Sequence, residues 1–85
     1  MRLDKYLKVS RIIKRRTIAN QAADSKKILV NDNIAKPSKE IRVGDIITIQ
    51  YYKRIMRVKV LLVSDNVKAA DADKMYEIIE IKDIA

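Results

Sequence analysis

Seven cationic side chains fall within the first seventeen residues of this chain, and a single carboxylate, Asp4, accompanies them. The seven cations are Arg2, Lys5, Lys8, Arg11, Lys14, Arg15 and Arg16. The stretch has a net charge of +6, whereas the whole chain has +8. Like charges placed so close together repel one another unless a polyanion neutralises them. Such a stretch is typical of a surface that binds nucleic acid through its phosphates, although a solvated helix face would have a similar composition.

The residue types that most enzymes need are missing from the sequence. There is no His and no Cys, which excludes the commonest general base, the commonest zinc ligands and disulfides. Asp71 and Asp73 lie in the acidic C-terminal third, and we interpret them as surface charge rather than metal ligands. We therefore expect no catalytic activity, no metal or other cofactor, and no small-molecule substrate.

The length and composition indicate one small domain spanning residues 1–85. Hydrophobic residues make up 48% of the chain and aromatic residues only 5%, so Ile, Val, Leu and Ala must form most of the core. No apolar run reaches the roughly 20 residues that span a bilayer, and the charged N-terminus does not resemble a secretory signal. We expect a cytoplasmic protein with no membrane partner, and its positive charge favours an anionic partner.

Two helices are expected to carry the basic stretch. Apolar residues at spacings of three and four predict the first helix over about residues 3–13. Its buried face would hold Leu3, Tyr6, Leu7, Ser10 and Ile13. Its solvent-facing side would hold Asp4, Lys5, Lys8 and Arg11. Asp4 is interpreted either as an RNA contact or as a residue that stabilises the helix, through the helix dipole or an ion pair with Lys8.

The second helix is predicted from Thr17, a candidate N-cap, to about Ser25. Its buried side would hold Ile18, Ala19, Ala22 and Ala23. Residues 14–16 are cations that come directly before the cap, where a helix N-terminus offers unpaired N–H groups and partial positive charge. The sequence therefore predicts a corner at which side chains and helix end act on the same phosphate. The hydroxyls of Ser10 and Thr17 are further candidate donors, with capping the favoured role for Thr17.

Short β-strand patterns follow the two helices. They fall at residues 28–30, 34–35, 46–52, 56–63 and 76–81. Residues 31–33 and 43–45 are interpreted as turns, and residues 65–74 as a short helix or an ordered loop. Tyr51 and Tyr52 alternate on a strand, so we expect at most one of them to be exposed. Together the elements predict an α+β fold in which N-terminal helices pack on a small, mainly antiparallel sheet.

Several blocks of the sequence match a known family in order and spacing. They are Arg2-Leu-Asp-Lys-Tyr-Leu7, Ser10-Arg11, Lys14-Arg-Arg-Thr17, Ile28-Leu-Val-Asn31, Lys36-Pro-Ser38 and Gly44-Asp45. On these blocks, residues 1–52 resemble the S4 (alpha-L) RNA-binding domain, and residues 53–85 would be a β-rich C-terminal extension. Lys8-Val-Ser-Arg11 and Ile13-Lys-Arg-Arg-Thr17 resemble the short stand-alone S4 proteins of the RqcP type. These proteins are related to a fifteen-kilodalton bacterial heat-shock protein.

The resemblance implies a function on the ribosome. Proteins of the RqcP type bind large (50S) ribosomal subunits that still hold peptidyl-tRNA after a stall, and they contact 23S rRNA and the tRNA. They support RqcH, which adds alanine to the C-terminus of the stalled chain. By resemblance, this chain is expected to be a cytoplasmic, ribosome-associated monomer with these partners. Two alternatives stay open: a heat-shock-type rRNA- or tRNA-binding protein that acts without RqcH, and a basic adaptor for an acidic protein.

Arg15 and Arg16 are the first candidates for RNA contacts, because a guanidinium group can grip a phosphate in two places. Arg2 and Arg11 follow them. The complete predicted site is Arg2, Asp4, Lys5, Lys8, Ser10, Arg11, Lys14, Arg15, Arg16, Thr17, Lys36, Ser38 and Lys39. The last three lie in a loop, for which a secondary RNA contact is slightly favoured over a plain solvated loop.

Lys26 and Asp32 stand where members of the family commonly have Gly. Asp tolerates a left-handed backbone at modest cost, whereas Lys is strained there if the position requires positive φ. Lys26 and the neighbouring Lys27 are also candidates for additional phosphate contacts.

Overall fold

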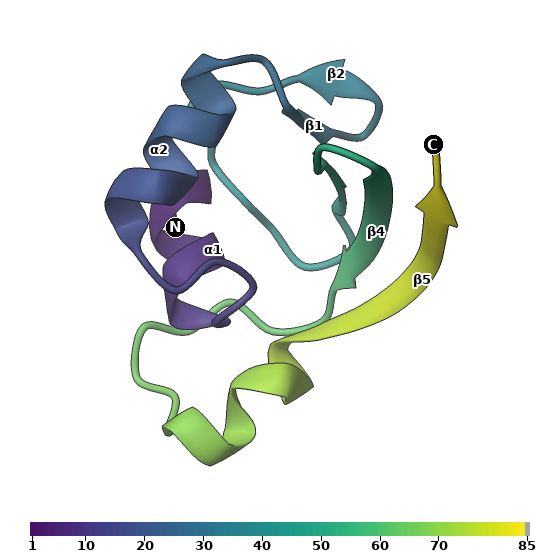
Figure 1. The fold of residues 1–85 in the computed structure, drawn as a ribbon. Coiled ribbons are helices and arrows are strands. Elements are labelled where there is room, and N and C mark those ends of the chain that lie inside the picture. The colour runs from purple at the N-terminus through teal and green to yellow at the C-terminus, as the bar shows by residue number, and fades with distance from the viewer. Residues whose placement is uncertain (85) are drawn as a thin grey trace.

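The computed structural model describes residues 1–84, whose helices and strands are shown in Figure 1. In chain order they are α1 (Leu3–Val9), α2 (Arg16–Asp24), β1 (Ile28–Val30), β2 (Asn33–Ile34), β3 (Ile46–Gln50), β4 (Arg54–Val60), the 3₁₀-helix η1 (Ala69–Met75) and β5 (Tyr76–Asp83). The strands form one sheet in the order β2-β1-β3-β4-β5, and each neighbouring pair is antiparallel. The predicted α+β fold is therefore confirmed.

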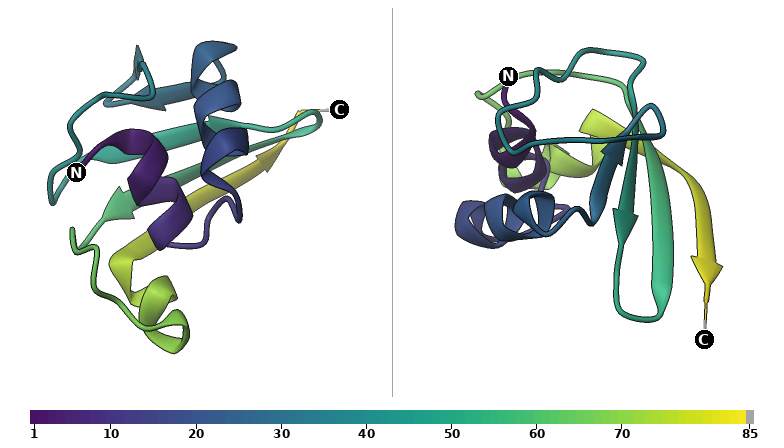
Figure 2. Two further views of the ribbon diagram at one scale, coloured as in Figure 1. Left: turned by 90° about the vertical axis from the view of Figure 1, so that its left-hand side faces the viewer. Right: turned by 90° about the horizontal axis from the view of Figure 1, so that it is seen from above.

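Helices α1 and α2 lie on one face of the sheet, whereas β5 at the far edge curves away from them (Figure 2). Leu3, Tyr6 and Leu7 of α1 are fully buried in one cluster with Ile47 of β3 and Val58 of β4. Full burial of such a side chain contributes about 1.5–3 kcal/mol, so this cluster holds the helices on the sheet. Within residues 1–84, no helix combines the length and apolar character required to cross a membrane.

Helix α1 ends at Val9, earlier than the predicted end at about residue 13. Arg11 has a φ of 61°, a left-handed conformation that cannot continue a right-handed helix. By turning here, the chain packs both Ile12 and Ile13 against the core, whereas a longer helix would have directed them to different faces. Burial of two isoleucines therefore outweighs the local preference for helix, and Arg11 lies in the turn between the helices.

Helix α2 begins at Arg16, so Thr17 lies in its first turn and is not the N-cap that the sequence predicted. Arg15 occupies the cap position without a side-chain cap hydrogen bond. Ala19 and Ala23 are buried as predicted, and their small side chains allow α2 to approach α1 closely. Ile18, predicted to be buried, is 47% exposed because it lies about 100° around the helix from Ala19.

The two predicted turns are confirmed by their backbone conformations. Asn31 and Asp32 have φ values of 52° and 68° and connect β1 to β2 as a two-residue hairpin loop. Gly44 has a φ of 94°, which L side chains rarely adopt. The side-chain amide of Asn31 donates to Asp45 Oδ1 at 3.1 Å, which ties the first turn to the second.

Strands β3 and β4 form an antiparallel hairpin, and both end earlier than the strand patterns predicted. β3 ends at Gln50 and not at residue 52, and β4 begins at Arg54, two residues before its predicted start. Tyr51 and Tyr52 are 41% and 90% exposed, so the expectation that at most one of them is exposed is wrong. Both tyrosines follow the end of β3 at Gln50, so the alternation of side chains along a strand does not apply to them.

The C-terminal part of the chain completes the same sheet and core. Val58, Val60 and Met75 are fully buried beside the α1 side chains. The Tyr6 hydroxyl donates to the Met75 carbonyl at 2.8 Å, and burial raises the pKa of Tyr6 well above its ordinary value. Of the two alternatives for residues 65–74, a short helix or an ordered loop, residues 69–75 form the helix, and β5 continues two residues beyond its predicted end.

Candidate nucleic-acid interface

Asp4 is the centre around which the basic side chains are arranged. It lies in the first turn of α1 and is only 2% exposed. Its carboxylate accepts hydrogen bonds from Arg2 Nε at 3.2 Å and Arg2 Nη2 at 3.3 Å. From α2, it accepts bonds from Arg16 Nη2 at 3.5 Å and Asn20 Nδ2 at 3.3 Å. One buried carboxylate therefore holds two guanidinium groups that come from different parts of the chain.

These bonds determine the charge state of Asp4. Burial by itself raises the pKa of a carboxyl group, because it disfavours the charged form. Hydrogen bonds from Asn20, Arg2 and the Lys5 N–H, together with the nearby charge of Arg16, outweigh burial, so the pKa of Asp4 lies below its ordinary value. Asp4 is thus an anion at neutral pH, and it can orient the two guanidinium groups electrostatically.

Asp4 does not lie on the solvent-facing side of α1, so that prediction is wrong, and so is the suggested ion pair with Lys8. A carboxylate that is 2% exposed is inaccessible to a macromolecule, and its role must be exerted through Arg2 and Arg16. Ser10 is equally inaccessible: it is 1% exposed, and its hydroxyl donates to the Leu7 carbonyl at 3.3 Å. Both residues therefore support the surface from inside.

Arg2 and Arg16 combine a fixed orientation with an open face. Their side chains are 51% and 47% exposed although each one bonds to Asp4. Arg16 and Thr17 line a shallow hollow of about 370 Å³ on α2, and Asp4 also lines it. A guanidinium that is bonded on one side and hydrated on the other can accept a phosphate without losing its position. Arg16 belongs to the corner predicted at residues 14–17, and phosphate binding at that corner stays a prediction.

The end of α1 and the turn that follows it carry a second group of cations. Lys8, Arg11 and Lys14 line one hollow of about 360 Å³ together with Asp65. These three side chains are exposed, and within residues 1–84 they have no ion-pair partner. Lys5 differs, because its ammonium group contacts Asp65 at 3.2 Å and is partly neutralised. Lys8, Arg11 and Lys14 are therefore better candidates for phosphate contacts than Lys5.

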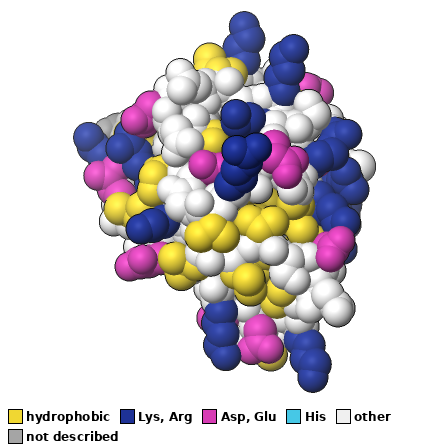
Figure 3. Space-filling view, turned by 180° about the vertical axis from the view of Figure 1, so that it is seen from behind, with side chains coloured by type: hydrophobic (Ala, Val, Ile, Leu, Met, Phe, Trp, Pro, Cys, Tyr) yellow, Lys and Arg dark blue, Asp and Glu magenta, His cyan; other side chains and the backbone are white. Residues whose placement is uncertain are grey.

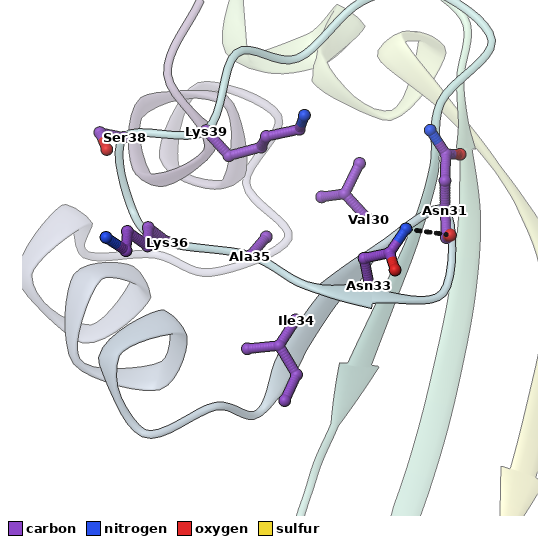
Figure 4. A pocket seen from close by; sticks show the side chains of 8 residues that line it. All are labelled: Val30, Asn31, Asn33, Ile34, Ala35, Lys36, Ser38 and Lys39. Atoms are coloured by element: carbon purple, nitrogen blue, oxygen red, sulfur yellow. Dashed lines mark hydrogen bonds between the residues drawn. The ribbon is translucent and has the colours of Figure 1, made fainter.

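The loop at residues 36–39 lies beside the helices rather than apart from them. Lys36, Ser38 and Lys39 are exposed and line a hollow of about 350 Å³ that extends to the β1–β2 turn (Figure 4). The backbone N–H of Leu3 donates to Lys39 O at 2.8 Å, and that of Asp4 donates to Pro37 O at 3.1 Å. The loop is thus anchored to the start of α1, next to Arg2.

Several of the predicted residues line hollows that share a residue. Arg2, Lys5 and Arg16 line one hollow, and Arg2 lines a second one with Lys36 and Ser38. Viewed from behind, Lys and Arg side chains gather along the right-hand edge, the side on which α1 and α2 lie, and others are scattered over the rest of this face (Figure 3). Asn20 and Asp65 belong to this surface although the sequence did not predict them. Asn20 follows Arg16 by one helical turn, a spacing that could have revealed it. Asp65 is far from the basic stretch in sequence, and nothing in the sequence pointed to its pairing with Lys5.

A known domain family matches the part of the chain that carries this surface. The S4 domain model matches residues 1–47. The chain belongs to the S4-domain family. It is 53% identical over 79 residues to the RQC P-site tRNA stabilizing factor of Streptococcus pneumoniae, covering 93% of this chain and 90% of the relative. It is 44% identical over 80 residues to the protein of the same name from Bacillus subtilis, covering 94% and 93%.

A solved structure supports the same assignment of the fold. The trimeric structure of heat shock protein 15 from Vibrio cholerae matches with a TM-score of 0.82 at 30% identity, covering 92% of this chain and 80% of that one. The resemblance to RqcP-type S4 proteins, with heat-shock proteins as relatives, is therefore confirmed. Because S4 domains bind RNA, this chain belongs to an RNA-binding family.

Proposed function

We propose that this S4 protein is a ribosome-associated quality-control factor that binds the large (50S) ribosomal subunit carrying stalled peptidyl-tRNA. The observation that carries the proposal is the pair of half-exposed guanidinium groups, Arg2 and Arg16, held by the buried Asp4. It is supported by 53% identity to a protein named RQC P-site tRNA stabilizing factor. In that function, the basic surface contacts the phosphates of 23S rRNA and of the tRNA.

The proposed partners follow from the resemblance to RqcP-type proteins. The protein steadies the tRNA on the 50S subunit while RqcH adds alanine to the C-terminus of the stalled chain. It acts as a cytoplasmic monomer, by binding rather than by catalysis. Recognition relies on the shape and phosphates of folded RNA, because Lys8, Arg11 and residues 14–16 expose a continuous run of cations along the helical segment.

Charge reversal at Arg16 tests the RNA-binding surface. Arg16→Glu places a carboxylate beside Asp4, removes one phosphate contact and adds repulsion, so we expect cosedimentation with 50S subunits to fall at least about tenfold at 0.15 M salt. Lys53→Glu is the matched control, because it makes the same change in net charge at the tip of the β3–β4 hairpin. Circular dichroism verifies that both variants are folded. Equal binding by both variants would contradict the assigned surface.

Deletion of the gene tests the quality-control function. Alanine tails on stalled peptides should be lost in the deletion strain and restored by the wild-type protein but not by Arg16→Glu. Unchanged tailing together with intact binding to 50S subunits would instead favour an RNA-binding role without RqcH. The similarity to heat shock protein 15, with a TM-score of 0.82, is the observation that makes this the second candidate function.

A salt series distinguishes RNA binding from a role as an adaptor for an acidic protein. With a labelled 23S rRNA fragment that contains the intersubunit stem-loop, each phosphate contact should contribute about −0.7 to −0.9 to the slope of log affinity against log salt. A slope near zero, or no binding, would favour the adaptor.

A further inference from the structure

Lys26 is held in a backbone conformation that suits glycine. Its φ is 62°, and it lies directly after the last residues of α2. The Lys26 N–H donates to Ala23 O at 3.0 Å, and the Lys27 N–H donates to Ala22 O at 3.1 Å. These two bonds form a Schellman motif, which ends many helices and places a left-handed residue, usually Gly, at the position of Lys26. The fold therefore imposes the strain, and a lysine side chain must tolerate it.

The side chain that carries this strain faces a basic hollow. Lys26 and Lys36 line a hollow of about 590 Å³ between α2 and the loop at residues 36–38, which we call the Lys26 hollow. Arg2 and Ser38 also line it, and Asp24 is the one carboxylate among its lining residues in the described part of the chain. Within residues 1–84, neither Lys26 nor Lys36 has a carboxylate within ion-pair distance. Their charges are thus available to an anion.

The Lys26 hollow is continuous with the surface that holds Arg16. Arg2 lines the Lys26 hollow and also a second hollow, which Arg16 and Lys5 share. Asn20 similarly lines both the Lys26 hollow and the hollow beside Thr17. A nucleic-acid backbone that binds at Arg16 can therefore reach Lys26 and Lys36 over either Asn20 or Arg2. Glu40 and Asp65 line the hollow on the Arg2 side, so the path over Asn20 is the less acidic one.

We propose that the Lys26 hollow is a second phosphate subsite for the RNA backbone. Lys26 and Lys36 provide its positive charge, and Ser38 provides a hydroxyl donor. The subsite lies at the C-terminal end of α2, whereas Arg16 lies at its N-terminal end. It extends the contact along the whole helix. The lysine at this position is strained, but it supplies a positive charge that glycine lacks. The added phosphate contact would offset the strain. This inference rests on the proposed RNA-binding function.

Replacement of Lys26 by glycine should move stability and binding in opposite directions. Lys26→Gly relieves the left-handed strain, so we expect the midpoint of thermal unfolding to rise by about 3–6 °C. It also removes one phosphate contact, so affinity for the labelled 23S rRNA fragment should fall about three- to fivefold at 0.15 M salt. The salt slope should lose about 0.7–0.9 in magnitude. Lys26→Gln, which keeps the strain, should weaken binding equally without raising the midpoint.

Asp32→Gly is the matched control, because Asp32 also has positive φ, at 68°, but does not line the Lys26 hollow. It should raise the midpoint without reducing the affinity or the magnitude of the slope. If wild type and Lys26→Gly bind the fragment with the same affinity and slope, the subsite is refuted while RNA binding stands. If the wild-type protein does not bind 50S subunits or the fragment at all, the proposed function itself fails, and the subsite fails with it.

Discussion

Replacement of Asp4 by asparagine should weaken RNA binding although it makes the protein more positive. Asp4→Asn keeps the shape of the side chain and removes its charge. Attraction between net charges alone predicts tighter binding to RNA. If Asp4 acts by orienting Arg2 and Arg16, both arginines lose their fixed orientation in the variant, and up to two phosphate contacts are lost. The affinity for RNA should then fall about 5- to 20-fold at 0.15 M salt. Net-charge attraction and arginine orientation thus predict changes of opposite sign in the affinity for RNA.

The stability of Asp4→Asn follows from the bonds that it loses. The Asn side-chain oxygen can still accept from the Lys5 N–H, which donates to Asp4 Oδ1 at 2.8 Å. The Asn nitrogen takes the place of Oδ2 and cannot accept, so the bonds from Arg2 Nη2 and Asn20 Nδ2 are lost. The bonds from Arg2 Nε and Arg16 lose their ionic character, but these side chains are about half exposed and all the lost or weakened bonds are long, at 3.2–3.5 Å. Solvent screening therefore limits the cost to about 1–2 kcal/mol. That corresponds to a fall of about 5–10 °C in the midpoint of thermal unfolding.

The pH dependence gives an independent check on the charge of Asp4. The folded-state pKa of Asp4 lies below its ordinary value of 3.8, so the ionised carboxylate stabilises the fold above that pH. This contribution is lost as pH falls through 3.8 toward the folded-state pKa. The difference in unfolding free energy between wild type and Asp4→Asn should therefore be full at pH 7 and shrink below about pH 4.

Two measurements decide the outcome for Asp4→Asn. Thermal unfolding between pH 3 and 7 gives the stability difference, and a salt titration with the labelled 23S rRNA fragment gives affinity at neutral pH. A folded variant that binds the fragment more tightly than wild type would refute the role of Asp4 in positioning the two arginines. A stability difference that grows toward low pH would refute its assignment as the stabilising anion.

Two further substitutions test the core beneath the surface. Tyr6→Phe removes a buried hydrogen bond to Met75 O, which still accepts from the Leu61 N–H at 2.8 Å, so the expected loss is about 0.5–1.5 kcal/mol and a midpoint lower by about 3–8 °C. An unchanged midpoint would show that this bond does not stabilise the fold. Thr48→Val removes a buried hydroxyl without a hydrogen-bond partner among residues 1–84, so denaturant unfolding should show a gain of about 1 kcal/mol. A loss of stability would mean that the hydroxyl is satisfied.

Local patterns predicted the parts of this fold that local forces determine. The spacing of Leu3, Tyr6 and Leu7 identified the buried face of α1, and Asn31-Asp32 identified a hairpin turn. The end of α1 was not predictable in this way, because Arg11 gives no sign of left-handed backbone. The burial of Ile12 and Ile13 against elements far along the chain imposes it.

The candidate interface was predicted in composition but not in geometry. Charge counting located Arg2 and Arg16, which are exposed as expected. Helical spacing assigned Asp4 to the solvent-facing side of α1, where a carboxylate normally lies. Its burial depends on Arg16 and Asn20 of α2, and that packing arises only after both helices settle on the sheet. The positions of charged residues along the sequence therefore cannot predict which cations contact a shared buried carboxylate.

The bond between Tyr6 and Met75 joins residues that are 69 positions apart, and this separation orders events during synthesis. The helices that carry the basic side chains leave the ribosome well before Val58, Val60 and Met75, which complete their core. Contacts of such long range form late, because a large loop must close first. A nascent copy of this protein thus presents its cations before it can fix them in place. We expect it to gain affinity for stalled subunits only once η1 and β5 have been made.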